Sequence, residues 1–138
     1  MKKFDTTSIF GIFGALSWAL TNLLRETTIN SLEIFNFILG IMPNIAATYF
    51  FIWVGKIIFE RLNKNFTLKF SMITSALVFL FAIISEIIHD LFLNSPFDMY
   101  DMIATSSAIA LYLITFYTTK NHRNISEQSS LFKNISSN

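Results

Sequence analysis

Residues 70–85 read FSMITSALVFLFAIIS, an apolar run without a charged side chain. An α-helix rises about 1.5 Å per residue, so about 20 apolar residues are needed to cross the hydrocarbon core of a bilayer. The apolar pattern continues past Glu86 to Leu93, which gives this run the necessary length. The sequence therefore predicts a transmembrane helix over residues 70–93.

Three further runs meet the same test. Residues 6–24 hold no charge over 19 positions, residues 34–55 none over 22, and residues 102–119 none over 18. Residues 120–138 are polar and poor in aromatic side chains, which is typical of a disordered tail. We therefore predict an all-α fold, an integral membrane four-helix bundle of residues 1–119, with spans at about 6–24, 34–59 or 43–59, 70–93 and 97–119.

The second span has two interpretations because Pro43 lies inside it. In one, a single helix begins near Ser31 and kinks at the proline. In the other, residues 28–41 lie along the membrane surface and the span covers residues 43–59. Proline is welcome at the first helical position, and 17 residues are just enough to cross, so we favour the second interpretation.

The basic residues predict the orientation of the chain. Lys and Arg concentrate in cytoplasmic loops, and nine of the ten basic residues are cytoplasmic if both termini are. Arg25 is the exception, between the first and second spans. The other nine are Lys2 and Lys3, then Lys56, Arg61, Lys64 and Lys69 in the second loop, and Lys120, Arg123 and Lys133 in the tail. We therefore predict a multi-pass protein of the bacterial cytoplasmic membrane with both termini, and the tail, in the cytoplasm.

The composition excludes several classes of function. A formal charge of +1 lacks the basic excess of a nucleic-acid-binding protein. The absence of cysteine excludes disulfides, thiolate metal sites and cysteine nucleophiles. The bilayer is the expected environment, and the sequence leaves the oligomeric state open.

The stretch SEIIHDLFLNSPFDMYDMIAT, residues 85–105, is acidic in an otherwise apolar chain. Glu86, His89 and Asp90 are spaced i, i+3 and i+4, so they lie on one side of the third helix. Glu86 lies about 10 Å along the helix from Leu93, deeper than a residue at the membrane surface. A charge at that depth is unfavourable by about 2.5–3.5 kcal/mol, so we expect Glu86 to face the bundle and find a partner.

The same stretch leads into the fourth span. Ser95 as N-cap, Pro96 at the first helical position and Asp98 at the third would form a capping arrangement that explains Asp98 structurally. Asp101 lies one turn deeper and has no such explanation. Because the turn is short, the third and fourth helices are expected to be antiparallel neighbours. Glu86, His89, Asp98 and Asp101 could then face one another, with Arg25 and Asn44 joining them.

This predicted polar cluster is compatible with several chemistries. Carboxylates and one imidazole suit a divalent cation such as Mg²⁺, Ca²⁺, Mn²⁺ or Zn²⁺, with Glu86, His89, Asp98 and Asp101 as the candidate ligands. Clustered carboxylates also favour proton handling, and Arg25 could bind a phosphate headgroup.

Structural roles explain several of these residues equally well. Asp90 and Asp98 could be a solvated rim. His89 could simply be packed, and Asn44 could satisfy carbonyls freed by Pro43. Gly11 and Gly14 indicate close helix packing. Trp53, Tyr112 and Tyr117 are interpreted as interfacial anchors.

The pattern E-x-x-H-x(8)-D-x-x-D-x-x-A, from Glu86 to Ala104, resembles the C-terminal signature of small VanZ-like membrane proteins. The stretch LGIMPNIAA, residues 39–47, resembles a Gly-x-x-Pro-Asn element of the same group. The resemblance implies a polytopic α-helical protein of the bacterial cell envelope, a group in which some members reduce susceptibility to teicoplanin-type glycopeptides. The resemblance implies that Glu86, Asp98 and Asp101 are site residues, and it implies the same, in second place, for Asn44 and His89.

Three functions remain open from the sequence. The favoured one is a non-enzymatic envelope protein whose outward-facing acidic pocket binds a lipid headgroup, a cell-wall precursor or a cation, because no recognisable catalytic set is present. A metal-dependent hydrolase or transferase acting on a lipid-linked substrate is the first alternative. An ion or proton carrier is the second, although the third span has an apolar gap between Ser85 and Ser75.

Overall fold

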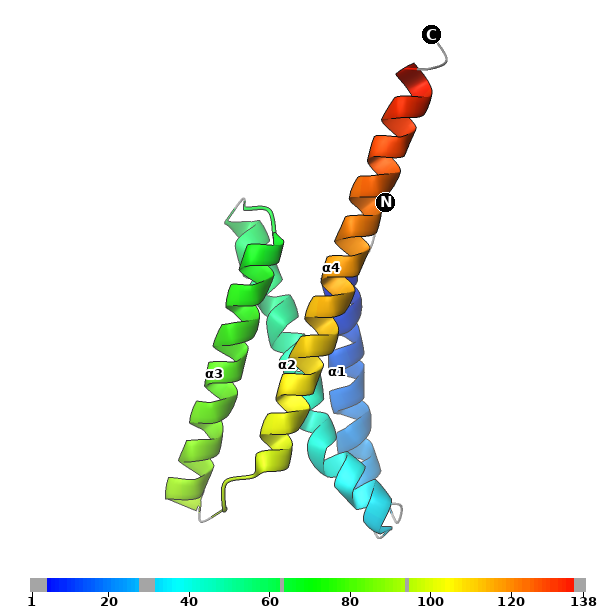
Figure 1. The fold of residues 1–138 in the computed structure, drawn as a ribbon. Coiled ribbons are helices and arrows are strands. Elements are labelled where there is room, and N and C mark those ends of the chain that lie inside the picture. The colour runs from blue at the N-terminus through cyan, green and yellow to red at the C-terminus, as the bar shows by residue number, and fades with distance from the viewer. Residues whose placement is uncertain (1–4, 28–31, 63, 94, 136–138) are drawn as a thin grey trace.

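The computed structural model describes residues 5–27, 32–62, 64–93 and 95–135, which fold into four α-helices. They are α1 (Thr6–Arg25), α2 (Glu33–Arg61), α3 (Leu68–Leu93) and α4 (Met99–Ile135) (Figure 1). These ranges contain no strand. Each helix includes a segment long and apolar enough to cross a membrane, so the prediction of an all-α chain with four candidate spans is confirmed.

The four helices alternate in direction (Figure 1). The Lys56 end of the bundle is defined here as the end where α1 and α3 begin and α2 finishes. The Glu86 end is the opposite one, where α1 and α3 finish and α2 and α4 begin. Large apolar side chains point outward between the two ends, among them Leu16, Phe81 and Phe92, which are 66%, 68% and 77% exposed. Such an apolar exterior is expected where a helix bundle faces lipid rather than water.

Aspartates cap α1 and α4. The N–H of Ser8 donates to Asp5 Oδ1 at 2.9 Å, and the N–H of Tyr100 donates to Asp98 Oδ1 at 2.8 Å. The prediction that Ser95 caps α4 is therefore wrong, because the helix begins only at Met99. The N–H of Ser95 instead donates to the His89 carbonyl at 3.3 Å, which closes the end of α3.

Helix α2 continues through Pro43, so the favoured interpretation, a span that starts at the proline, is wrong. A proline inside a helix has no N–H to give to the carbonyl four residues earlier, which here belongs to Leu39. That carbonyl has another donor, because Arg25 Nη2 lies 2.7 Å from it. The apolar residues before Pro43 can thus stay helical without an orphaned carbonyl.

The core is centred on Tyr112, which is 0% exposed. Its ring lies edge-on to Phe10 with centroids 5.5 Å apart, and Phe10 packs in the same way on Tyr49 at 4.8 Å. The prediction that Tyr112 anchors the chain at the membrane surface is therefore wrong. Its side chain points into the bundle, where its hydroxyl has protein partners.

Helices α1 and α2 pack closely through glycines. A Cβ on Gly14 would lie 2.6 Å from the Ala46 carbonyl oxygen, and one on Gly11 would overlap the side chain of Trp53. The prediction of close packing at these glycines is confirmed. Helix α3 contacts α2 and α4, and its described residues make no contact with α1 (Figure 1). The bundle is therefore tight on the α1 side and looser around α3.

Helix α4 extends to Ile135. The sequence predicts disorder from residue 120 onward, and the structure differs by continuing the helix through most of that tail. No glycine or proline lies between Met99 and Ile135 to end the helix. The segment apolar enough to span a membrane covers only Met99–His122, so the rest of α4 extends beyond it.

Candidate functional site

Glu86 is the most deeply placed of the predicted site residues. It lies about two turns before the end of α3, and only 8% of it is exposed. Its Oε1 accepts a hydrogen bond of 2.8 Å from the backbone N–H of Asp98. This bond joins α3 directly to the start of α4. It also compensates the buried Glu86 carboxylate for part of the hydration that it loses.

Asp101 lies next to Glu86 at the first turn of α4 and is half-buried. Its carboxyl group is hydrogen-bonded by the side chain of Asn44 and is close enough to Asp98, Glu86 and Arg25 to feel their charges. The structure therefore brings Glu86, Asp98, Asp101 and Asn44 together from three helices. We call these four residues the polar cluster.

The remaining predicted residues are placed differently. His89 and Asp90 are both exposed on α3. Among the described residues no group of three or more His, Asp or Glu side chains is close enough to hold a metal ion, so the geometry of this part of the chain gives the metal alternative no support.

Arg25 has a structural partner. Its guanidinium donates to the Leu39 carbonyl, and within the described ranges it forms no salt bridge. Arg25 therefore satisfies the carbonyl freed by Pro43. The sequence had suggested Asn44 for this structural role. Asn44 is left to hydrogen-bond Asp101.

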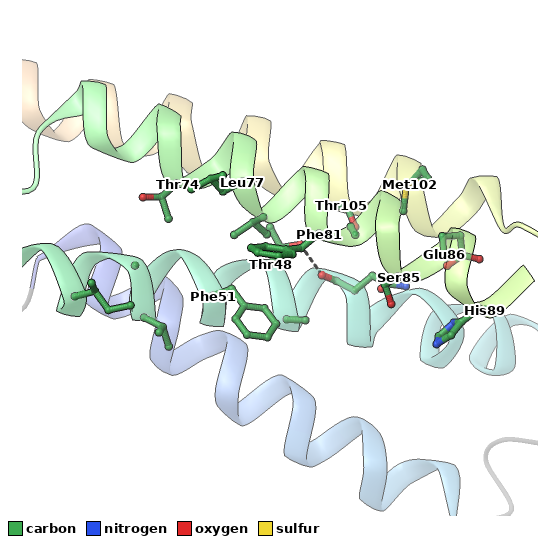
Figure 2. Close-up of a pocket in the computed structure, with 17 residues that line it drawn as sticks. Thr48, Phe51, Thr74, Leu77, Phe81, Ser85, Glu86, His89, Met102 and Thr105 are labelled. Carbon is green, nitrogen blue, oxygen red and sulfur yellow. Dashed lines mark hydrogen bonds between the residues drawn. The ribbon is translucent and has the colours of Figure 1, made fainter. Parts of the chain in front are cut away.

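A cavity of about 620 Å³ lies between α2, α3 and α4 and begins at the polar cluster. Figure 2 shows Glu86, Ser85 and His89 at one end, Thr74 and Leu77 at the other, and the rings of Phe51 and Phe81 between them. Its volume is within the range of about 300–1,000 Å³ that is usual for pockets that bind small ligands. The cavity thus has a polar end and a long apolar body.

Two hydroxyl groups near the far end of the cavity have no hydrogen-bond partner. They are Thr74 Oγ1 and Ser75 Oγ, whose residues are 6% and 2% exposed. Thr74 lines the cavity. A buried hydroxyl without a partner is unfavourable by about 1–3 kcal/mol, so these two groups mark a part of the bundle not optimised for stability alone.

The Lys56 end contains polar interactions that the sequence did not reveal. Lys56 is only 7% exposed and lies inside α2, within the span predicted to reach residue 59, although the count of basic residues assigned it to the following loop. Its Nζ lies 2.9 Å from Asp5 Oδ2 and 3.1 Å from Glu60 Oε1, and it donates to Ser8 Oγ at 3.2 Å. The span predicted to residue 59 already includes Ile57, Ile58 and Phe59, but the partners of Lys56 were not predicted.

Asp5 is the partner that caps α1 and pairs with Lys56. Burial alone would raise the pKa of Asp5. The hydrogen bonds from the Ser8 N–H and from Lys56, together with the Lys56 charge, outweigh burial and lower that pKa below its ordinary value. Asp5 therefore stays ionised and holds the start of α1 to the end of α2.

Beside this ion pair, Tyr112 links three helices. Its hydroxyl lies 2.9 Å from Thr7 Oγ1 in α1 and accepts a 3.0 Å hydrogen bond from Ser71 Oγ in α3. Thr7 and Ser71 are both 0% exposed. The Lys56 end is thus closed by side chains that satisfy one another.

Comparisons with protein-family models, with curated proteins and with solved structures find no match to this chain. The VanZ-like resemblance of residues 39–47 and 86–104 therefore stays a prediction. A function for this chain has to be inferred from the geometry of its site.

Proposed function

We propose that this chain is a VanZ-like multi-pass protein of the bacterial cytoplasmic membrane that binds a ligand at its polar cluster. Both termini lie in the cytoplasm, so the Glu86 end faces outward. The ligand is a lipid headgroup, a cell-wall precursor or a cation, and binding alters how the cell surface meets glycopeptide antibiotics. The protein acts by binding rather than by catalysis.

The observation that carries the proposal is the position of Glu86. A buried carboxylate at the mouth of a 620 Å³ cavity, with Asp101 and Asn44 beside it, is a costly arrangement in an apolar bundle. Polar groups that converge on one end of an apolar pocket are typical of ligand sites. The charge distribution supports the orientation, because Arg61, Lys64 and Lys69 lie at the Lys56 end.

Orientation can be tested directly because the chain has no cysteine. A single cysteine at Ser95, which is exposed at the Glu86 end, should react with a membrane-impermeant maleimide in intact cells. A single cysteine at Lys64, at the other end, should react only after the cells are lysed. The opposite labelling pattern would mean that the protein has the inverted orientation and that its site does not face outward.

Function can be tested with the double variant Asp98→Asn, Asp101→Asn. Asparagine caps helices about as well as aspartate, so α4 should form normally while the cluster loses two charges. We expect the variant to reach wild-type levels in the membrane and to lose any shift in teicoplanin susceptibility that the wild type confers. The matched control is Asp90→Asn, an exposed acid outside the cluster, which should leave that shift intact. A susceptibility shift that survives in the double variant would refute the role of the cluster.

Proton transfer is a second candidate function, because hydroxyl groups from other helices lie beside the apolar gap along α3. Thr48 in α2 and Thr105 in α4 are 2% and 1% exposed, and both line the cavity. A pH-sensitive dye inside liposomes tests this function. Proton flux that Glu86→Gln abolishes would support it, and flux equal to that of empty liposomes would exclude it.

A further inference from the structure

We propose that the cavity holds one hydrocarbon chain of a membrane lipid whose headgroup carries an ammonium group, with that group at Glu86. The inference rests on the proposed function and names the ligand of the same site. It is carried by the length, the opening and the charge of the cavity.

The cavity has the shape for a chain rather than for a headgroup alone. It is lined along α2 from Asn44 to Ile58 and along α3 from His89 to Thr74. The fourteen or fifteen helical steps between these residues correspond to about 21–23 Å. One leaflet contributes about 15 Å of hydrocarbon depth, half of the bilayer core. A hydrocarbon chain whose headgroup is held at the Glu86 end can therefore fit into the cavity over its whole length.

The cavity is also open sideways, in the direction from which a lipid would enter. Phe51, Leu77 and Phe81 line it and are still 56%, 50% and 68% exposed. Helix α3 contacts only α2 and α4 among the described helices, so the opening lies beside the loosest helix of the bundle. In a bilayer such an opening faces acyl chains, which can enter it without crossing water.

The charge of the polar end selects the headgroup. Glu86 lines this end of the cavity together with His89, and the carboxylates of Asp98 and Asp101 lie close to Glu86 without lining the cavity. The nearby cation, Arg25, already donates to the Leu39 carbonyl. An ammonium group would be attracted to this end, whereas a headgroup with only phosphate charge would be repelled. Glu86 uses Oε1 for the Asp98 N–H, so its second oxygen is available to a ligand.

The test is native mass spectrometry of the full chain with two lipids that have identical acyl chains, phosphatidylethanolamine and phosphatidylglycerol, and with soluble phosphoethanolamine. We expect one phosphatidylethanolamine per chain, retained at least tenfold better than phosphatidylglycerol. Glu86→Gln should reduce this preference at least tenfold, and Asp90→Asn should leave it unchanged.

A second pair of variants tests whether the hydrocarbon chain of the lipid occupies the cavity. Ala82→Phe fills the cavity from α3, whereas Ala76→Phe places the same ring on the exposed face of the same helix. Only Ala82→Phe should lower lipid retention, and Ala47→Phe, which fills the cavity from α2, should do the same if Ala82→Phe fails to fold.

The outcomes separate the inference from the proposed function. Equal retention of both lipids, unaffected by Ala82→Phe, overturns the inference. If only phosphoethanolamine binds tightly and Glu86→Gln abolishes that binding, the cavity does not hold a hydrocarbon chain. The polar cluster would then still be a headgroup site. Loss of all binding in every arm overturns the inference and the lipid-headgroup form of the proposed function, whereas the proposed function as a whole is tested by the Asp98→Asn, Asp101→Asn variant.

Discussion

The two ends of this bundle treat charge in opposite ways. At the Lys56 end, one buried cation meets two carboxylates and a hydroxyl. At the Glu86 end, three carboxylates lie near one arginine that is already engaged by a backbone carbonyl. The first arrangement satisfies itself, whereas the second leaves negative charge facing a cavity.

Two buried hydroxyl groups of α3 differ in the same way, although both lie in the half of the helix nearer the Lys56 end. Ser71, towards the Lys56 end of α3, donates to Tyr112. Ser75, one turn farther along the same helix, is equally buried but has no partner. Buried polar groups that are all paired make a helix bundle rigid and specific, whereas unpaired ones lower its stability. The comparison of charges teaches that the Lys56 end holds the bundle together, whereas Glu86 at the other end lines a cavity; the unpaired hydroxyls lie between these two regions.

Lys56→Met should have the largest effect on stability. It leaves Asp5 and Glu60 without their cation, and breaking a buried ion pair usually lowers stability by about 3–5 kcal/mol. We expect about 2–3 kcal/mol, because the side chains of Asp5 and Glu60 are 34% and 51% exposed and keep some hydration. Equilibrium unfolding in mild detergent measures it, and a loss below about 0.5 kcal/mol would show that this end is not the closed one.

The same ion pair predicts a pH dependence. Because the pKa of Asp5 is lowered in the folded chain, its contribution to stability is fully present above the unfolded pKa of about 3.9. That contribution is lost as the pH falls through the lowered, folded value. Unfolding measured from pH 6 to pH 3 should therefore show a loss of stability on acidification that is smaller in Lys56→Met.

Arg25 and Pro43 give the next largest effect, at the Glu86 end. Arg25→Ala leaves the buried Leu39 carbonyl without a donor and should lower stability by about 1–3 kcal/mol. In a Pro43→Ala background the new N–H can bond that carbonyl, so the same arginine replacement should have little effect. A double-mutant cycle measures the coupling, and additive effects would mean that Arg25 has another role, including ligand binding.

Ser71 and Ser75 form a matched pair with a smaller effect. Ser71→Ala removes the hydrogen bond to Tyr112 and should lower stability by about 0.5–1.5 kcal/mol. Ser75→Ala removes a hydroxyl that has no partner and should be neutral or stabilising. If Ser75→Ala were as destabilising as Ser71→Ala, the contrast between the paired and the unpaired hydroxyl would be lost.

Glu86→Gln should have the smallest effect on stability. Glutamine keeps an oxygen that can accept the Asp98 N–H, and it removes a charge close to Asp98 and Asp101. We expect stability within about 0.5 kcal/mol of the wild type, together with a loss of the preference for phosphatidylethanolamine. A large destabilisation would make Glu86 a structural residue like Lys56.

Much of the fold was predictable from the sequence because span length and charge are local properties. The glycines at positions 11 and 14 also carried enough information to predict close packing. Lys56 and Tyr112 were misassigned because their types favour a loop and a membrane surface, respectively. Only partners from other helices, Asp5 in one case and Thr7 and Ser71 in the other, make their burial favourable.

The site was predicted in part for the same reason. Helical spacing and the short turn to α4 indicated that Glu86, Asp98 and Asp101 would meet. Spacing could not show that His89 is exposed or that Arg25 would serve Leu39. Those outcomes depend on how α1, α2 and α3 rotate about their axes.

By itself, the sequence determined four apolar helices and an acidic connection, since each follows from the residues of one segment and the 1.5 Å rise of a helix. The tertiary structure decided which polar groups are paired. Lys56 and Asp5 are brought together across more than fifty residues, and Tyr112 and Thr7 across 105. Such pairing is a property of helix packing, and packing also leaves the cavity beside Glu86 open.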